Sequence, residues 1–583
     1  VTRARPSANQ MCPLMGLADC APRCPRLPNP LPTHLRGCWG SPCKWGIRAS
    51  DGVGRESDPQ ESVKQLRTRH RRILESIYKD SGSDFLIANS TAQCGTAPLV
   101  SALKTSAQQA VVCFHFPGHN RGKASPPALS QLVGLGAFVH DLPELPELDD
   151  LFTPKGVILD AQKKASELFG SSETWFLVGG TTCGIQASIM ATCSPGETLI
   201  LPRNSHISAT SGMVLSGAVP KYVIPEYNSQ WDIACGVTPL QVESAIKELA
   251  EDGKKAAAVL VTSPTYHGIC SKLSGIAEVC HSHGIPVIVD EAHGAHFKFH
   301  PGFPSTALEQ GADLTAQSTH KVLCSLTQSS MLHVGGTLID REHVGRCLQM
   351  LQSSSPSYLL LASLDAARAQ LSENPDTIFD EAVILASETR KEIEAIPGIS
   401  VLSSSDMFSS FSDIDPLRVT VSVSQLGLSG YEADDILAEE HQIISELAGT
   451  RSITFAINLG TCGEDIQKLI SSIKHLSATF FKKNRSHPCM EDGVTGAPFA
   501  DVHMSLSPRD AFFAKKRKVD IWRSIGQVSG ELICPYPPGI PVLIPGEVIT
   551  EEAVNYLLHL RKKGAMISGA ADRQLSSVVV CDR

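Results

Sequence analysis

The sequence predicts an α/β protein with a mainly parallel central sheet, a smaller α+β domain and an appended C-terminal domain. Between about residues 155 and 340, short apolar runs alternate with helical stretches, which is typical of strands covered by helices on both faces. After about residue 350 the pattern changes, and LRVTVSVSQLG and RSITFAINLG indicate strands of a smaller unit. A turn-rich stretch near residue 490 then precedes a last segment that contains CPYPPGIPVLIPGE.

The elements are expected in a definite order along the chain. Helical spacing begins near Gln60, in ESVKQLRTRHRRILESIYKD, and APLVSALKT predicts a second, short helix. FHFPGHNRGK, with one proline and two glycines, indicates a loop. Six strands are then expected, in TWFLVG, ETLILP, PKYVIP, AAAVLVTS, IPVIVD and the weaker ADLTAQS.

The helix expected in TPLQVESAIKELAEDG contains its own start signal. Thr238 is suited to the N-cap, Pro239 to the first helical position, and Gln241 to the return bond of a capping box. ASLDAARAQL predicts a further helix after the sheet. Because ligands of parallel α/β sheets bind outside the carboxyl ends of the strands, the residues directly after each apolar run are the candidates for a functional site.

Composition and charge exclude several classes of protein. The chain has 583 residues, 42% of them apolar, which is enough for a sizeable core and roughly two to four domains. A net charge of −9 argues against a duplex nucleic-acid binder, and no run of about 18 apolar residues predicts a membrane span. The 18 cysteines are scattered without a repeated CxxC pair, so we expect reduced thiols rather than a zinc ribbon or a disulfide framework.

The segment VDEAHGAHFKFH, residues 289–300, admits three interpretations. A DEAH-box helicase requires a phosphate loop upstream, but the nearest glycine pair, in GHNRGKA, is one residue too close and is followed by Ala124 in place of a hydroxyl residue. A zinc site would use His293, His296 and His300, but no cysteine lies nearby and no HExxH motif occurs. The third interpretation is a pyridoxal phosphate (PLP) enzyme.

A PLP site requires four groups, and a candidate for each directly follows an apolar run. The amine that forms a Schiff base is offered by Lys321 in QSTHK, and the carboxylate that faces the pyridine nitrogen by Asp290. The phosphate cradle at a helix N-terminus is offered by residues 181–183, after TWFLVGG, and the flat group on the ring by His206. Each group alone is a weak signal, but their joint order favours PLP.

The run from about Phe116 to Met350 resembles the Orn/Lys/Arg decarboxylases of the aspartate-aminotransferase (PLP fold type I) superfamily, and YPPGIPVLIPGE resembles the small domain which that family appends. The motifs are FPGHNRGK, LPELDDLFTPKG, GGTTCG, PRNSH, SPTYHG, VDEAHGAH, QSTHK, SPSYLLLASLDAAR and PYPPGIPVLIPGE. The resemblance covers roughly residues 60–580. It is to the shorter arginine/lysine decarboxylase type, because too few residues precede FPGH for an N-terminal receiver-like domain.

The resemblance implies roles for individual residues. Lys321 would be the Schiff-base lysine, Asp290 the partner of the pyridine nitrogen and His206 the ring on the cofactor face, with His206 or Lys321 as proton donor to Cα. The phosphate is expected among Thr181, Thr182, Cys183, Ser318 and His320. His293 is expected beside the cofactor and Glu531 beside the basic end of the substrate, and no metal is expected. Where the family more often has NGTS, this chain has GGTT, and Cys183 replaces a frequent hydroxyl residue.

The implied reaction is decarboxylation of a basic amino acid to its amine and CO2 in polyamine metabolism, with arginine placed first and lysine or ornithine close behind. The enzyme is expected to be a homodimer or higher homo-oligomer without nucleic-acid or membrane partners, and SPSY around Ser355 is expected to serve the neighbour's site. Two alternatives remain open. One is an aminotransferase or lyase of the same fold, with Arg418 or Arg451 holding the α-carboxylate, and the other is a non-catalytic regulatory subunit.

Six segments follow from these patterns. The first fifty residues contain seven basic residues against a single acid, Asp19, which is typical of a transit peptide, so we expect a plastid or other organelle, or otherwise the cytoplasm. An unstructured tail or a mistranslated upstream segment are the alternatives. The expected segments are the leader (1–57), an N-terminal helical segment (58–145), the PLP-binding major domain (146–350), the small α+β domain (351–481), a linker (482–502) and the C-terminal decarboxylase domain (503–583).

Overall fold

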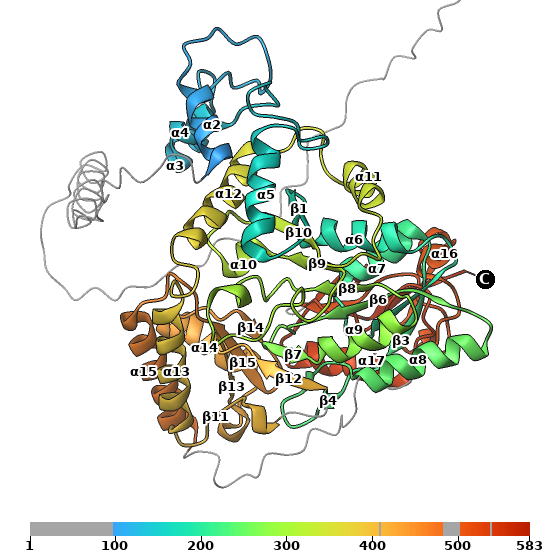
Figure 1. Ribbon diagram of the computed structural model, residues 1–583. Helices are drawn as coiled ribbons and strands as arrows, with labels where there is room; N and C mark the ends of the chain where they lie inside the picture. Colours follow the sequence, from blue (N-terminus) through green and yellow to red (C-terminus); the bar gives the residue numbers. More distant parts are fainter. Residues whose placement is uncertain (1–96, 407–409, 482–501, 537–538, 583) are drawn as a thin grey trace, which may run out of the picture. The chain divides into compact units, whose positions relative to one another are not determined.

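The computed structural model describes residues 97–406, 410–481, 502–536 and 539–582 (Figure 1). The predicted leader, the helix predicted near Gln60 and nearly all of the predicted linker lie outside these residues. The first described helices are α2 (Pro98–Gln108), α3 (Pro127–Val133) and α4 (Leu135–His140). The short helix predicted in APLVSALKT is therefore confirmed as α2, and FHFPGHNRGK is a loop as predicted.

A seven-stranded sheet with the strand order β1-β10-β9-β8-β6-β2-β3 forms the centre of the fold. The strands are β1 (Glu173–Leu177), β10 (Ser330–Val334), β9 (Leu314–Gln317), β8 (Val287–Asp290), β6 (Ala256–Thr262), β2 (Thr198–Pro202) and β3 (Val219–Val223). From β9 to β3 every pair is parallel, whereas β10 is antiparallel to both of its neighbours. The mainly parallel sheet and all six predicted strands are confirmed, and β10 is the strand that the sequence pattern missed.

Helices cover both faces of this sheet (Figure 1). Leu199 and Leu201 of β2 pack with α6 (Gly180–Thr192), α7 (Ile207–Ser216) and α11 (Arg341–Leu351), while Ile200 faces α8 (Pro239–Glu251) and α9 (Leu273–Ser282). Alternate residues of a buried parallel strand therefore enter two different cores, which explains its uninterrupted apolar sequence. The predicted start of α8 is confirmed, because the Thr238 hydroxyl accepts from the Gln241 amide at 3.1 Å and the Gln241 side chain accepts from the Thr238 amide at 2.9 Å.

The smaller unit is an antiparallel sheet with the order β11-β13-β15-β14. Its strands are β11 (Ser400–Val401), β13 (Arg418–Ser422), β15 (Ser452–Ala456) and β14 (Leu447–Ala448), and its helices are α13 (Asp380–Glu394), α14 (Gly430–His441) and α15 (Gly463–Phe480). The strands predicted in LRVTVSVSQLG and RSITFAINLG are thus confirmed. This sheet shares one apolar cluster with α5 (Val157–Phe169) and α12 (Tyr358–Glu373), which join it to the central sheet. A short ribbon of β12 (Phe411–Ile414) and β7 (Ile269–Ser271) makes a second connection.

The C-terminal segment has an apolar cluster of its own. It contains α16 (Pro508–Phe513), β16 (Lys516–Asp520) paired with β19 (Ser577–Cys581), β17 (Cys534–Tyr536) paired with β18 (Met566–Ser568), and α17 (Glu551–Lys562). It docks on the major unit through α16 against α7 and through a buried ion pair of Arg203 with Glu547. The segment is therefore placed close to the turn that follows β2.

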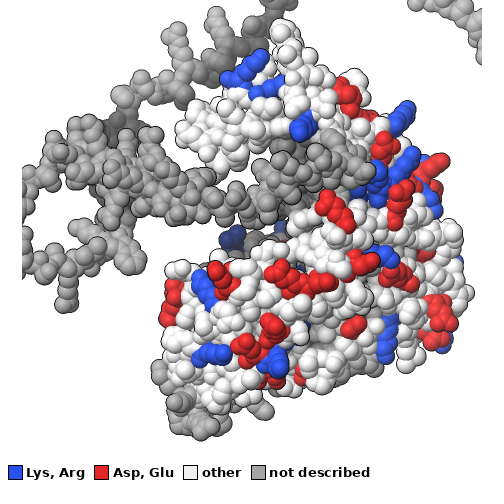
Figure 2. All heavy atoms as spheres, turned by 60° about the vertical axis from the view of Figure 1, so that its left-hand side comes forward, with Lys and Arg blue, Asp and Glu red and all other residues white. Residues whose placement is uncertain are grey.

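Three further features concern the charge of the surface, the length of the helices and the state of the cysteines. On the face drawn in Figure 2, acidic and basic side chains are interspersed. None of the helices in the described residues is long and apolar enough to cross a membrane. Every cysteine in the described part of the chain is a free thiol, as predicted.

Candidate active site

A cavity opens at the carboxyl ends of the parallel strands. Asp290 ends β8 opposite Thr262 of β6 and Ala316 of β9, and the polar residues after β9 follow at the same edge. The predicted site residues that line this cavity are Thr181, Thr182, His206, Asp290, His293, Ser318, His320 and Lys321. Chain segments more than a hundred residues apart thus bring together the side chains that the strand-end rule had selected.

Lys321 belongs to a chain of polar contacts that leads into the small unit. Its Nζ lies 3.0 Å from Nε2 of His293, and Nδ1 of His293 lies 3.3 Å from Nη2 of Arg418, on β13. A guanidinium can only donate hydrogen bonds, so Nδ1 accepts and a neutral His293 holds its proton on Nε2, facing the lysine. Burial, followed by the charges of Lys321 and Arg418, lowers the pKa of His293 well below its usual value, which keeps the ring neutral.

Asp415 anchors this chain from behind. Its carboxylate accepts from Nε2 of His296 at 3.1 Å and from the Leu417 amide at 2.9 Å, and lies 3.9 Å from Nε of Arg418. Asp415, His296 and Arg418 are all buried. Arg418 therefore lies close to an acid that no solvent screens.

The three histidines of VDEAHGAHFKFH do not converge on one point. His296 bonds Asp415, and His300 pairs with Asp380 at 3.3 Å, so neither ring faces the cavity that His293 lines. Within the described residues, the one group of three side chains spaced to share a metal ion is Glu440, His441 and His475. His296 is fully buried.

Asp290, Lys321 and His206 influence one another inside the cavity. Burial raises the pKa of Asp290, and the neighbouring His206 and Lys321 oppose that rise. Burial likewise lowers the pKa of Lys321, against the attraction of Asp290 and Glu446. A lysine whose pKa is lowered exposes a larger neutral fraction, which is the form that attacks an aldehyde.

His206 caps α7 and lies beside the C-terminal segment. Its Nδ1 accepts from the Ser208 amide at 3.2 Å, so a neutral ring holds its proton on Nε2. Burial lowers the pKa of His206, with Asp290 acting in the opposite direction. A Cβ added at Gly539 would lie 3.7 Å from Cδ2 of His206, so the backbone of the proline-rich turn closes one side of this ring.

The start of α6 and the residues after β9 form a cradle of hydroxyl groups. Thr181 Oγ1 lies 2.6 Å from the Ser318 hydroxyl and 3.0 Å from that of Ser330, and Gly180 adopts a φ of +71° at the start of the helix. Hydroxyls beside the free amides of a helix N-terminus suit a phosphate. His320 extends the edge of this cradle and is held through Nδ1, which donates to the Ser329 carbonyl at 2.8 Å.

The donor set therefore fits PLP. A carboxylate lies at the end of β8, a lysine amine lies within reach of the same cavity, and the hydroxyl cradle opens at the N-terminus of α6. His206 supplies a flat ring on the cavity wall. Thr262 adds a buried hydroxyl without a hydrogen-bond partner at the end of β6.

Two predicted site residues lie elsewhere. Cys183 packs in an apolar cluster, burial raises its pKa to about 12, and it does not line the cavity. The carboxylate of Glu531 accepts from the amides of Ala571 and Val579, both at 2.7 Å, and also lies outside the cavity lining. Ser355, which is expected to serve the neighbour's site, is exposed on this chain.

Sequence reasoning did not select several residues of the cavity wall, among them Thr262, Tyr266, Glu446 and Tyr536. Thr262 and Tyr266 follow the apolar core of β6, so the same strand-end rule could have selected them. Glu446 precedes β14 and Tyr536 ends β17, and both reach the cavity only through the packing of other segments. The sequence offers no local signal for these two.

The chain is similar to known decarboxylases over most of its length. Residues 97–465 match the family described as Orn/Lys/Arg decarboxylase, major domain, and residues 495–572 match Orn/Lys/Arg decarboxylase, C-terminal domain. An arginine decarboxylase of Bacillus subtilis is 37% identical over 83% of this chain and 97% of its own length. An arginine decarboxylase of Halalkalibacterium halodurans is 38% identical, over 82% and 95%.

Lysine decarboxylases are more distant relatives. Lysine decarboxylase LdcA of Pseudomonas aeruginosa is 26% identical over 79% of this chain and 75% of its own length. Among solved structures, that of Francisella novicida lysine decarboxylase LdcF aligns with a TM-score of 0.71 at 24% identity, over 83% of this chain and 81% of the other. This last likeness shows a shared fold.

Proposed function

The chain belongs to the Orn/Lys/Arg decarboxylase family and is a PLP-dependent amino acid decarboxylase, and from this premise we propose arginine as its preferred substrate. The products would be CO2 and agmatine, an amine from which polyamines are made. The main support is the similarity to relatives named arginine decarboxylase, which are 35–38% identical, against 23–26% for those named lysine decarboxylase. Lysine and ornithine are then poorer substrates.

In this proposal Lys321 is the covalent anchor of the cofactor. Nε2–H of His293 donates to its nitrogen, which favours the neutral amine that both bonding and release of substrate require. Asp290 would face the pyridine nitrogen and hold a proton there, with His206 and Lys321 opposing the rise that burial causes in its pKa. Bound PLP supplies an electron sink for the pair that remains on Cα when CO2 leaves.

Other residues of the cavity position the cofactor and move the last proton. Thr181, Ser318 and the N-terminal amides of α6 would hold the phosphate, with Thr182 and His320 at its edge. His206 would cover one ring face, and His206 or Lys321 would return a proton to Cα. Cys183 and Glu531, whose side chains lie outside the cavity lining, take no direct part in this version of the site.

The packing of the arginines favours decarboxylation over aminotransfer. Arg418 could hold an α-carboxylate, but it is buried behind His293 and near Asp415, and it does not line the cavity. Arg451 does not line the cavity either. The presence of Lys321, Asp290 and His206 together around one cavity argues against a purely regulatory subunit.

We further propose a homodimer or higher homo-oligomer, and a transit function in an organelle such as a plastid for residues 1–57. The acid-poor composition of the first fifty residues supports the second proposal. Light scattering of the purified chain tests the first, and the N-terminal sequence of the protein isolated from its cell tests the second. A monomer, or a mature protein that retains these residues, would contradict them.

Substrate choice is tested with the purified chain and added PLP. Arginine, lysine and ornithine are supplied separately, and CO2, the amine and any keto acid are measured. We expect the highest kcat/KM for arginine, with one CO2 for each amine formed and no keto acid. A higher kcat/KM for lysine or ornithine contradicts the proposed substrate, and keto acid without CO2 contradicts the reaction.

A further inference from the structure

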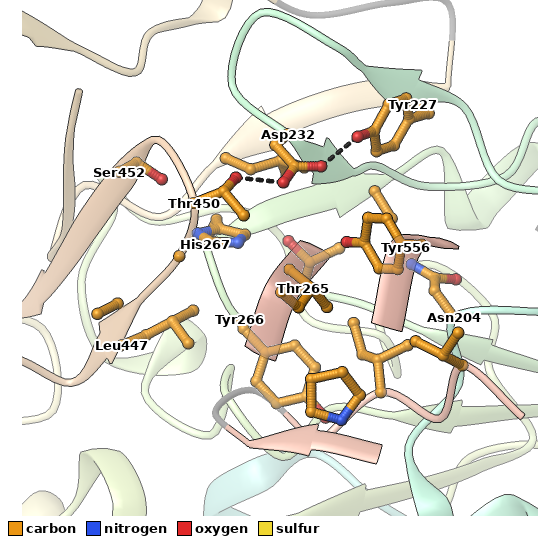
Figure 3. A pocket seen from close by; sticks show the side chains of 18 of the residues that line it. Asn204, Tyr227, Asp232, Thr265, Tyr266, His267, Leu447, Thr450, Ser452 and Tyr556 are labelled. Carbon is orange, nitrogen blue, oxygen red and sulfur yellow. Dashed lines mark hydrogen bonds between the residues drawn. The ribbon is translucent and has the colours of Figure 1, made fainter. Parts of the chain in front are cut away.

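A second cavity adjoins the cofactor cavity and shares Thr262, Tyr266 and Leu447 with it. The space between its lining atoms amounts to about 890 Å³, part of which is open to solvent. In Figure 3, Tyr266 lies at the lower end of this cavity and Asp232 at the upper end. A ligand that enters past Tyr266 therefore extends from the cofactor toward Asp232.

Asp232 belongs to the hairpin between β4 (Tyr227–Asn228) and β5 (Ile233–Ala234) and has a φ of +54°. One carboxylate oxygen accepts from the Tyr227 hydroxyl and the other from the Thr450 hydroxyl (Figure 3). A carboxylate offers about four acceptor positions, so each oxygen retains capacity for a further donor. Tyr227 of the β4–β5 hairpin and Thr450 of the small unit thus orient Asp232 toward the cavity.

The charge of Asp232 has no counter-ion among the described residues. No lysine, arginine or histidine of the described chain lies within 4.0 Å of its carboxylate. The positive charge of Arg451 opposes the rise in the pKa of the neighbouring Tyr227, but Arg451 makes no ion pair with Asp232. A partly buried acid in a cavity that offers it no cation suits a cationic ligand.

Aromatic rings surround the path to this acid. Tyr227, Tyr266, Tyr431 and Tyr556 all line the cavity. Burial raises the pKa of Tyr431, and Asp232 raises it further, so this hydroxyl stays neutral beside the carboxylate. Tyrosine faces attract cations, and a guanidinium also stacks on them through its planar surface.

We propose that this cavity binds the cationic end of the substrate and that Asp232 is its counter-ion. The inference rests on the proposed function, because it assigns the cofactor cavity to the α-carbon end of an amino acid. Acid and rings together fit a guanidinium better than an ammonium, since a guanidinium pairs with a carboxylate through two parallel bonds and stacks as well. Glu446, which lines the cofactor cavity itself, is the competing acid.

The test compares arginine with citrulline, which has the same shape but a neutral urea group. The discrimination ratio, kcat/KM for arginine over that for citrulline, is measured for the wild type, Asp232→Asn, Glu446→Gln and the matched control Asp252→Asn at an exposed position. Asp232→Asn is expected to lower the ratio about 10- to 100-fold, as is usual for a lost hydrogen bond to a charged group. The visible absorbance of the bound cofactor should remain, because Lys321 and Asp290 are intact.

Two results overturn the inference. One is an unchanged ratio in Asp232→Asn, and the other is a ratio that falls in Glu446→Gln but not in Asp232→Asn. Should Asp232→Asn not fold, Thr450→Val serves, because loss of one hydroxyl that orients the acid should lower the ratio by roughly 2- to 10-fold. Failure of the wild type to decarboxylate any basic amino acid refutes the proposed function alone. Equilibrium dialysis of arginine against wild type and Asp232→Asn then still tests the cavity, with equal affinities overturning the assignment.

Discussion

Loss of the Glu547 carboxylate should destabilise the protein and disturb its active site together. Arg203 and Glu547 are only 1% and 3% exposed. Nε and Nη2 of Arg203 donate to the two carboxylate oxygens at 2.7 and 2.8 Å, and Nη1 donates to the Pro541 carbonyl at 2.6 Å. The guanidinium thus ties the turn after β2 to the C-terminal segment without access to solvent.

The magnitude follows from the charge that the substitution leaves behind. Glu547→Gln preserves the shape of the side chain but leaves a buried guanidinium without its anion, which costs about 3–5 kcal/mol. Total stability of a folded domain is roughly 5–15 kcal/mol, so this is a large fraction. Replacing both partners, as in Arg203→Met with Glu547→Leu, removes the buried charge as well and should recover much of the loss.

Activity should fall too, because Arg203 lies three residues before His206. Urea unfolding measured by circular dichroism gives the free-energy difference, and kcat for arginine reports on the site. Glu552→Gln, at an exposed position on α17, is the matched control and should change neither quantity. If the free energy of unfolding of Glu547→Gln lies within about 0.5 kcal/mol of that of this control, the buried pair does not hold the two segments together.

Three further outcomes are expected. Lys321→Ala should abolish amine formation and the visible absorbance of bound cofactor, and amine production at the wild-type rate would refute its role as anchor. Arg418→Gln removes a cation that lowers the pKa of His293, so the acid limb of the pH–rate profile should move to higher pH; an unmoved limb contradicts the contact. Burial opposes the ionisation of Asp149, but backbone amides at residues 150, 155, 156 and 159 lower its pKa from the usual 3.8. The ionised carboxylate therefore stabilises the folded protein above that pH, and this contribution is lost as the pH falls through the lowered pKa. Asp149→Asn should therefore cost roughly 1 kcal/mol at pH 7 and progressively less as the pH falls through the lowered pKa, and a cost independent of pH, measured by unfolding at neutral and at acid pH, counts against this.

Local pattern was sufficient for most of the sheet and for the strand-end residues of the site. Buried parallel strands are continuous apolar runs, and their carboxyl ends share one edge, so Asp290, His206 and Lys321 could be selected without knowledge of the packing. The strand β10 escaped because SMLHV is short and contains serine and histidine, which interrupt an apolar run. The predicted segment boundaries remain our proposal.

The differences between the predicted site residues and the cavity lining have a geometric cause. Successive residues of a helix point about 100° apart, so Cys183 lies roughly 200° around α6 from Thr181 and faces the core rather than the cradle. Glu446 enters the cavity from the turn before β14, where no apolar run marks a strand end. Tertiary packing alone brings such a residue to the site.

The spacing of His293, His296 and His300 shows how a sequence pattern can indicate a metal that the packing does not support. Metal ligation needs ring nitrogens that are free to converge, yet Nδ1 of His293 already accepts from Arg418, and Nε2 of His296 bonds Asp415. Both partners belong to the small unit, so the histidines act as links between that unit and the cofactor cavity. A shift of β13 would therefore act on Lys321 through two contacts, Arg418 to His293 and His293 to Lys321. It would change how strongly His293 holds the proton on Nε2, the nitrogen that faces the lysine.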